Sequence, residues 1–124
     1  MEETTTVGAD FVRALAIKEF DRVRELMDPE IDFAGLTPRR HWQAGGPDEV
    51  ISTILRQWFE DSDEIEALEQ LDHDVIADRE RVGYRFSVTN PDGRFLVEQQ
   101  AYLAAQDGRI TWMRVLCSGF RPVG

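Results

Sequence analysis

Cysteine and histidine are scarce in this sequence, and each scarcity excludes a kind of chemistry. Cys117 is the only cysteine, so neither an intramolecular disulfide nor a cysteine-based zinc site can form. His41 and His73 are the only histidines, and they lack the spacing of metal ligands. There is no glycine-rich phosphate loop and no Gly-x-Ser-x-Gly elbow, which excludes nucleotide-dependent and serine-hydrolase chemistry. We therefore expect no metal and no cofactor.

Long apolar runs and clusters of basic residues are missing as well. No window approaches the roughly 18 apolar residues of a membrane span, and residues 1–10 contain no Arg or Lys. The 24 acidic residues outnumber the 14 basic ones, and the formal net charge of −10 repels nucleic acid and anionic membranes. Together with the lone thiol, these features predict a cytoplasmic protein that binds neither nucleic acid nor membrane.

What is present is the composition of a globular chain. The 124 residues are 42% hydrophobic and 31% charged, which predicts a single domain over residues 1–124. At this size, folding buries roughly two-thirds of the surface of the unfolded chain, enough for a core and one modest cavity.

The beginning of the sequence has the period of amphipathic helices. Apolar residues recur at three- and four-residue steps over residues 11–27, with Asp10 as the expected N-cap. Asp21 is a second capping residue, so the pattern predicts a long helix followed by a short one. Pro29 ends the helical pattern because it disfavours a helical conformation in its predecessor.

Beyond these helices the pattern changes. Residues 31–33 predict a short strand, residues 36–46 an irregular loop, and Pro47 the first turn of another helix that runs to residue 59. A two-residue period then predicts an acidic edge strand within residues 60–78 and three further strands at residues 82–88, 95–105 and 109–117. Turn signals separate the last three strands. Helices followed by an antiparallel meander define an α+β fold in which one sheet wraps the helices.

The two tight turns fix a register and therefore which side chains share a face. We expect Gln106 to pair with Arg109, and Val88 with Leu96. The face toward the helices then holds Val82, Tyr84, Phe86, Val88, Leu96, Glu98, Gln100, Tyr102, Met113, Val115 and Cys117. The opposite face holds Arg81, Gly83, Arg85, Ser87, Val97, Gln99, Ala101, Leu103, Ile110, Trp112, Arg114 and Leu116. This mixed composition predicts a homodimer through the outer sheet face, and a one-residue slip in either turn would exchange the two faces.

The order of elements and three short strings resemble the nuclear transport factor 2-like superfamily, in particular its SnoaL-like group. The strings are DPEIDF at residues 28–33, GPDEV at residues 46–50 and DGRIT at residues 107–111, with residues 11–27 as the opening helices. The resemblance implies a cystatin-like α+β cone: N-terminal helices packed in a strongly curved mixed or antiparallel sheet around an apolar pocket. Members include ketosteroid isomerase, polyketide cyclases, dehydratases and epoxide hydrolases, together with transport and assembly proteins that have no catalytic activity.

In catalytic members of that group, a carboxylate in the cone acts as the general base, because an apolar wall raises its pKa toward neutrality. Asp32 lies near the position where such members carry their base; its alternative is an exposed residue on a half-buried strand. Glu98 is the second candidate base, because the expected register sets it on the cone face. Its alternative is a structural hydrogen bond to Arg39 or Arg40.

Further candidates surround these carboxylates. The expected register places Tyr84 as a hydrogen-bond donor on the same face, and His41 is a candidate proton carrier that could equally cap or pack. Ligand contacts are expected from Arg40, Trp42, Trp58, Gln100 and Tyr102. The alternatives are an ion pair for Arg40 and a core position for the two tryptophans. Cys117 alternates with apolar residues, which favours a buried inert thiol.

Two functions fit these patterns. The first is a SnoaL-like pocket protein that binds an apolar, ring-containing metabolite and acts as a cofactor-independent isomerase, cyclase or dehydratase. The alternative is a non-catalytic dimeric binding or assembly module whose cone is filled by its own side chains. An open apolar cavity of roughly 300 Å³ containing Glu98 or Asp32 would favour the first function, and a filled cone the second.

Overall fold

The computed structural model describes residues 6–123. The helices are α1 (Val7–Ala16), α2 (Phe20–Glu25), α3 (Pro47–Glu49) and α4 (Arg56–Trp58), and the π-helix η1 (Val50–Leu55) joins the last two. The strands are β1 (Met27–Thr37), β2 (Arg40–Gly45), β3 (Glu64–Ile76), β4 (Arg79–Asn90), β5 (Gly93–Gln106), β6 (Arg109–Cys117) and β7 (Arg121–Pro122).

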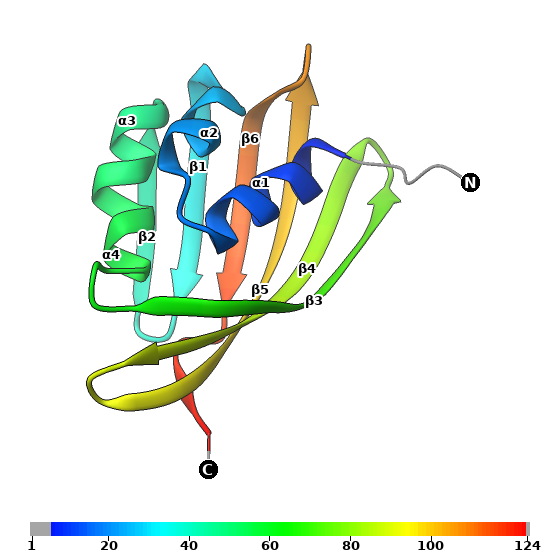
Figure 1. The fold of residues 1–124 in the computed structure, drawn as a ribbon. Coiled ribbons are helices and arrows are strands. Elements are labelled where there is room, and N and C mark those ends of the chain that lie inside the picture. Colours follow the sequence, from blue (N-terminus) through cyan, green and yellow to red (C-terminus); the bar gives the residue numbers. More distant parts are fainter. Residues whose placement is uncertain (1–5, 124) are drawn as a thin grey trace.

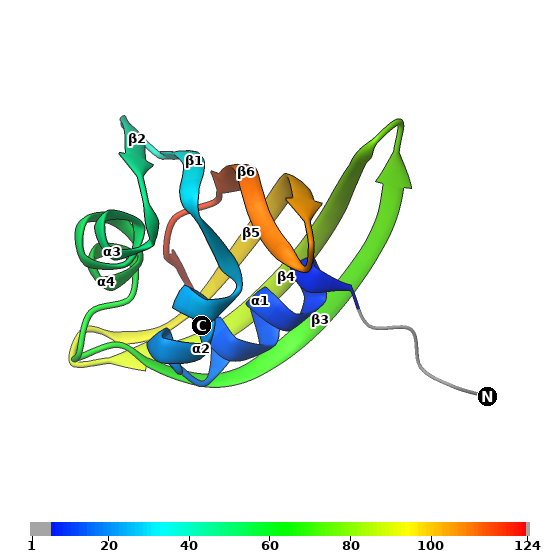
Figure 2. The same ribbon diagram turned by 90° about the horizontal axis from the view of Figure 1, so that it is seen from above.

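The strands form one strongly bent sheet that does not close (Figure 1). Its order is β2-β1-β6-β5-β4-β3, with β7 paired to β5. Strands β1 and β6 run parallel, and every other described pair is antiparallel. Viewed from above, the sheet curves around α1 and α2, and the helical segment 47–58 lies beside β2 (Figure 2). The predicted α+β cone with a mixed sheet is confirmed, and β3 is its predicted acidic edge strand.

The opening helices begin earlier than the sequence predicts. Thr6, and not Asp10, is the N-cap of α1, because its side chain accepts a hydrogen bond from the backbone N–H of Ala9. The Glu80 carboxylate of β4 completes this cap, since it accepts hydrogen bonds from the Thr6 hydroxyl and the Gly8 N–H. The helix ends before Lys18, whose φ of 56° is incompatible with continuing it.

The segment predicted as an irregular loop is a β-hairpin. Residues 36–46 contain the end of β1 and all of β2, which pair from Thr37 with Arg40 to Asp32 with Gly45. In the turn between them, Arg39 has a φ of 73°. This left-handed conformation is usually occupied by glycine or asparagine. The prediction of a loop was wrong because no such residue marks this turn.

The predicted register of the sheet was also wrong, by one residue in each hairpin. Asn90 pairs with Gly93, which sets Val88 opposite Phe95 and not opposite Leu96. In the second hairpin Gln106 does pair with Arg109, but an irregularity next to Ala104 shifts the ladder beyond it. The shift sets Tyr102 opposite Arg114 and Gln99 opposite Cys117.

These slips exchange the two faces of β5. Val97, Gln99, Ala101 and Leu103 are buried under the helices, where the predicted register placed their even-numbered neighbours. Leu96, Glu98, Gln100 and Tyr102 belong to the outer face instead. The residues predicted inside on β4 and β6 are buried as expected, including the thiol of Cys117. The outer face is therefore more polar than predicted, and the cone contains Gln99 where Glu98 was expected.

Candidate functional site

A row of polar side chains crosses the inner face of the sheet. Tyr84 on β4 pairs with Gln99 on β5, and Gln99 pairs with Cys117 on β6. All three are buried, and Gln99 is only 4% exposed. The next residues on the same face of each strand are apolar members of the core, such as Phe86 and Val97. The row is thus a small polar patch in an otherwise apolar interior.

Tyr84 and Gln99 are hydrogen-bonded to each other. The Tyr84 hydroxyl donates to Gln99 Oε1 at 2.6 Å. This bond leaves the Gln99 Nε2 group buried without a partner in the structure. A buried donor without a partner costs about 1–3 kcal/mol, because it has lost the water that it binds in the unfolded chain.

Burial also favours the protonated form of Tyr84. It raises the pKa of Tyr84 far above the ordinary value, because the phenolate would lose its hydration, and the neighbouring Cys117 adds to the effect. Tyr84 is therefore a neutral phenol at physiological pH. Its single proton is directed at Gln99.

Trp58 supplies a second buried donor. Its side chain lies at the end of α4, is 7% exposed, and its Nε1 has no hydrogen-bond partner. The ring packs against Phe33 of β1 and, edge-on, against Trp42 of β2, with centroids 6.1 Å apart in both pairs. Gly35 makes room for it, because a Cβ at that position would lie 2.6 Å from the Trp58 ring.

The helical segment that positions Trp58 has an unusual pitch. Its buried residues fall into two series with a repeat of four: Val50, Ile54 and Trp58, and Ile51, Leu55 and Phe59. A repeat of four is longer than the 3.6 residues of an α-helical turn. The π-helical turns of η1 accommodate it and keep both series facing the sheet.

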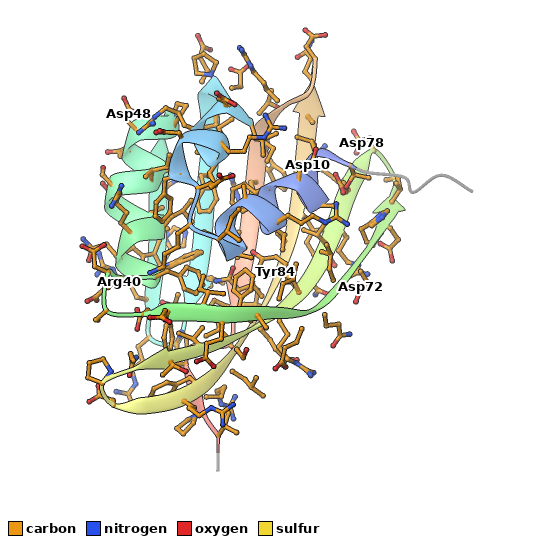
Figure 3. The ribbon with its side chains drawn as sticks, viewed as in Figure 1. Asp10, Arg40, Asp48, Asp72, Asp78 and Tyr84 are labelled. Atoms are coloured by element: carbon orange, nitrogen blue, oxygen red, sulfur yellow. The ribbon has the colours of Figure 1, made fainter. Side chains whose placement is uncertain are left out.

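The edge of the cone beside Trp58 is formed by the β1–β2 hairpin. Trp42 donates a hydrogen bond from Nε1 to the Thr37 hydroxyl at 2.8 Å. The guanidinium of Arg40 stacks over the Trp42 ring at 3.6 Å, in a cation–π contact. In Figure 3, Tyr84 lies in the middle of the molecule, while Arg40 and Asp72 lie toward opposite sides. Stacked side chains thus lead from exposed Arg40 through Trp42 to buried Trp58.

The two carboxylates predicted as bases are not in the cone. Glu98 is on the outer face and pairs with Arg85 at 2.8 Å, not with Arg39 or Arg40. Asp32 pairs with Arg114 at 3.3 Å. Their side chains are 57% and 58% exposed, so neither has the apolar surroundings on which the predicted role as a base depends. That role stays a prediction.

The remaining predicted contacts line two hollows of the outer face. One hollow, of about 330 Å³, is bordered by His41, Gln100 and Tyr102 together with Leu36 and Leu116. The other, of about 520 Å³, has Gln100 and Leu116 in common with the first, and its lining also includes Gly83, Tyr84, Gln99 and Cys117. The paired charges of Arg81, Asp72, Arg85 and Glu98 surround it. The structure therefore divides most of the predicted site. The side chains of Trp42 and Trp58 lie on the inner side, and those of Asp32, His41, Glu98, Gln100 and Tyr102 on the outer side. Tyr84 is buried on the inner face and also borders the larger outer hollow.

Buried charge is rare in the described part of the chain. Asp63 is the one charged residue of 6–123 that is buried, and it has partners of its own: the Glu60 N–H and the Asn90 side-chain amide. No group of three or more His, Cys, Asp or Glu within these residues is arranged to hold a metal ion. None of their helices is long and apolar enough to cross a membrane.

Gln99 is not among the site residues predicted from the sequence, although the sequence contains a signal for it. The odd-numbered residues of β5 from 95 to 103 include four apolar residues, whereas the even-numbered residues from 96 to 102 include only Leu96 and Tyr102. Counting apolar residues on each face would have favoured the register that the structure has. In that register Gln99 is the polar residue on the core face, where Glu98 was predicted to lie.

Comparisons with known proteins identify the fold. No family model matches the sequence, and no curated protein matches it. Among solved structures, a protein named "Putative Isomerase" from Rhodopseudomonas palustris is 21% identical, with a TM-score of 0.76 over 94% of this chain and 93% of that one. An NTF2-like protein from Burkholderia thailandensis is 16% identical, with a TM-score of 0.71 over 93% and 92%. A "putative polyketide cyclase" from Xanthomonas campestris is 14% identical, with a TM-score of 0.69 over 89% and 86%.

The chain therefore has the nuclear transport factor 2-like fold, and its structural neighbours include proteins with isomerase and cyclase names. The resemblance predicted from the sequence is confirmed at the level of the fold. A fold of this kind supports many functions, so the function must be argued from the site.

Proposed function

We propose that the protein binds a small apolar molecule inside the cone, as a SnoaL-like pocket protein. The observation that carries this proposal is the presence of two buried N–H donors without partners, Gln99 Nε2 and Trp58 Nε1. Each costs the fold about 1–3 kcal/mol, which a ligand that accepts a hydrogen bond there would recover. The polyketide cyclase name among the structural neighbours agrees with a ring-containing ligand.

Catalysis in the cone would need a base that the described inner side chains do not supply. A cofactor-independent isomerisation, cyclisation or dehydration would use Asp32 or Glu98 as the base and His41 as a proton carrier, yet all three side chains lie on the outer face. Within the cone, Tyr84 is a neutral donor and there is no described carboxylate beside it. The geometry thus supports binding in the cone more strongly than proton abstraction there.

The test of binding is ligand-dependent stability. The protein is purified from its own host, examined by native mass spectrometry for a retained small molecule, and then melted with steroid-like, polyketide-like and terpenoid compounds. A ligand present at a hundred times its Kd stabilises the fold by about 2.7 kcal/mol. A retained mass or such a shift supports the proposal, and the absence of both contradicts it.

A double substitution tests whether the buried polar groups are kept for a ligand. In Tyr84→Phe/Gln99→Leu the hydrogen-bonded pair and the free donor are replaced together by apolar groups of similar size. Removing both partners of a buried hydrogen bond is nearly neutral or stabilising. We therefore expect an unliganded variant at least as stable as the wild type that has lost its ligand-dependent shift. If the variant keeps the full ligand-dependent stabilisation, the ligand does not bind at Tyr84 and Gln99.

A second function is favoured by a different observation, the hollows and exposed leucines of the outer face. Leu36 and Leu116 are 49% and 57% exposed and border the same hollow. The inner aromatic side chains are closely packed. The ring centroids of Phe59 and Phe86, for example, are 5.6 Å apart. These features suit the alternative predicted from the sequence, a non-catalytic dimeric module whose outer sheet face binds a second copy.

The oligomeric state separates this alternative from the first proposal. We expect Leu116→Asp to convert a dimer of the wild type into a monomer in analytical ultracentrifugation, because it introduces a charge into the apolar contact. Val75→Asp is the matched control, since Val75 is 73% exposed and borders neither outer hollow. A wild type that is monomeric at micromolar concentration would contradict the outer-face dimer and leave binding in the cone unaffected.

A further inference from the structure

We propose that the smaller hollow of the outer face is a ligand site of its own, which binds a small amphipathic carboxylate. Its volume of about 330 Å³ is at the lower end of the range of ligand pockets. Its lining residues come from β2, β1, β6 and β5, which follow one another in the sheet (Figure 1). The site goes beyond the proposed function, because none of the residues that line it belongs to the buried patch of Tyr84, Gln99 and Cys117.

The shape of the hollow comes from one small side chain among larger ones. Ala34 on β1 is buried, yet it does not belong to the hydrophobic core of the cone. Its partner on β6 is Arg114, and two residues further along β1, Leu36 pairs with Leu116. Residues two apart on a strand share a face, so these three larger side chains stand around the alanine. Ala34 is thus the floor of the hollow, and the two exposed leucines are its apolar wall.

The charge of the hollow is opposite to that of the whole chain. None of the described residues that line it is acidic, and Arg114 contributes a positive charge. The side chains of His41, Gln100 and Tyr102 can each donate a hydrogen bond there. Residues 33–47, which include the β1–β2 hairpin, contain two arginines and no acid, in a chain with 24 acids. The hollow is therefore complementary to an anion, although the net charge of −10 repels anions from the rest of the surface.

The guanidinium of Arg114 is held in place by the protein itself. Its Nη1 donates hydrogen bonds to the backbone carbonyls of Asp32, at 3.0 Å, and Met113, at 2.9 Å. The group also stacks over the Trp112 ring at 4.7 Å. The Asp32 carboxylate lies 3.3 Å from Nη2, which leaves the Nε–H and one Nη2–H for the carboxylate of a ligand. Because the guanidinium is already ordered, binding at these two groups costs little further conformational entropy.

A ligand for this hollow needs an apolar part and a charged part. An exposed ion pair with Arg114 alone is weak, since water and salt screen it. Contact with Leu36 and Leu116 alone favours any apolar molecule of the right size, whatever its charge. A carboxylate on a small ring system uses both halves at once: the ring covers the leucines, and the carboxylate lies against Arg114.

Three naphthalene derivatives test this preference, because they share a ring system and differ in charge. They are 2-naphthoate, which is an anion, 2-naphthylmethanol, which is neutral, and 2-naphthylmethylammonium, which is a cation. We expect isothermal titration calorimetry to show that naphthoate binds about fivefold more tightly than the alcohol, and that the cation binds least tightly. Unspecific association with a chain of net charge −10 would give the reverse order.

Two arginine variants form a matched pair. The side chains of Arg114 and Arg85 are both 36% exposed, and each is paired with an acid on the outer face, but only Arg114 lines this hollow. Arg114→Gln should weaken naphthoate about fivefold and leave the affinity for the alcohol within about 1.5-fold, whereas Arg85→Gln should change neither. A merely structural role of Arg114 would weaken both ligands equally.

Asp32→Asn tests the same site in the opposite direction. The Asp32 carboxylate competes with a bound anion for Arg114, and its removal frees a further N–H. We expect this variant to bind naphthoate about twofold more tightly than the wild type and to bind the alcohol as the wild type does. Weaker binding of naphthoate in Asp32→Asn would contradict the assignment of Arg114 as the anion-binding group.

The location of the ligand distinguishes this site from the cone. In two-dimensional NMR, naphthoate should shift the resonances of Leu36 and Leu116 and leave the Trp58 indole unchanged. Shifts confined to Trp58 and Gln99 would place naphthoate in the cone, which overturns the outer site and supports the proposed function. No binding at up to about 1 mM, or equal affinity for all three compounds, overturns the outer site and leaves the cone untouched. A stable dimer that binds no naphthoate overturns it too, since a second copy then occupies the hollow.

Discussion

The hydroxyl of Tyr84 donates a hydrogen bond of 2.6 Å to Oε1 of Gln99, across neighbouring strands and out of contact with solvent. A buried network of this kind specifies the local structure only if each member is satisfied. Here one half is satisfied and the other half, Gln99 Nε2, is not. The same pair therefore links the stability of the sheet to the ligand binding that we propose for the cone.

Alkaline pH should weaken the fold through Tyr84. Burial raises the pKa of its phenol in the folded chain, whereas the unfolded chain loses this proton near pH 10. The folded state thus binds more protons above that pH, and the free energy of unfolding falls by up to about 1.4 kcal/mol per pH unit. The stabilisation is fully present below pH 10 and is lost as the pH rises toward the folded-state value.

Urea unfolding between about pH 9 and pH 11.5 measures this slope. Tyr84→Phe should be less stable than the wild type at neutral pH by about 1–2 kcal/mol, because the Gln99 amide loses its remaining partner, and its alkaline slope should be shallower. Tyr102→Phe, on the outer face, should keep the wild-type slope. Identical slopes in all three proteins would show that Tyr84 does not titrate differently on folding.

The outer face should contribute a dependence in the acid range. Arg81 hydrogen-bonds the carboxylates of Asp72 and Asp74, and this bond lowers the pKa of Asp74. A carboxyl whose pKa is lowered by folding contributes stability above its unfolded value, near pH 3.9, and loses it as the pH falls through the folded value. Asp74→Asn should therefore show a smaller fall in Tm between pH 5 and pH 2. Because these groups are exposed, we expect the two curves to differ by at most about 5 °C.

The packing of Trp58 on Gly35 should make that glycine indispensable. A Cβ there would lie 2.6 Å from one ring carbon of Trp58 and 2.8 Å from a second, too close for any side-chain contact. We expect Gly35→Ala to destabilise the fold by about 1–3 kcal/mol, as overpacking of a core does. Gly45→Ala is the control, since its nearest neighbour atom is 3.9 Å away.

A double-mutant cycle with Trp58→Phe identifies the cause. Phenylalanine lacks the outer part of the indole that meets position 35, so the double variant should be more stable than the sum of the single effects predicts, by at least about 1 kcal/mol. Strictly additive effects would mean that Gly35 is required for another reason.

The fold class was predicted well from the sequence because it depends on hydrophobic periodicity and on turn residues. Both are local features that can be recognised within a short stretch of sequence. The helical stripe of residues 11–27, the turn at Asp107-Gly108 and the length of the last strands all appear in the structure. The hairpin turn at Arg39 was missed, because its positive φ occurs without a glycine. Such a turn is set by the pairing of β1 with β2 and not by its own residues.

The site was predicted less well than the fold for a physical reason. Side chains alternate along a strand, so a slip of one residue sends every side chain to the other face. The irregularity beside Ala104 and the pairing of Asn90 with Gly93 each cause such a slip. As a result, Glu98 lies on the outer face and Gln99 on the inner face, opposite to the prediction, although the strands themselves lie where they were expected. A titratable acid in the cone thus became a neutral amide.

The exposed carboxylates provide the last prediction, which separates binding from catalysis. Asp32 and Glu98 are each paired with an arginine on the outer face, so Asp32→Asn and Glu98→Gln should change the Kd of a cone ligand by less than about twofold. Gln99→Met removes the free donor itself and should weaken the same ligand by about tenfold. Isothermal titration with one ligand and all three variants makes the comparison. Loss of binding in Glu98→Gln with retention in Gln99→Met would instead place the ligand against Glu98 in the outer hollow of about 520 Å³.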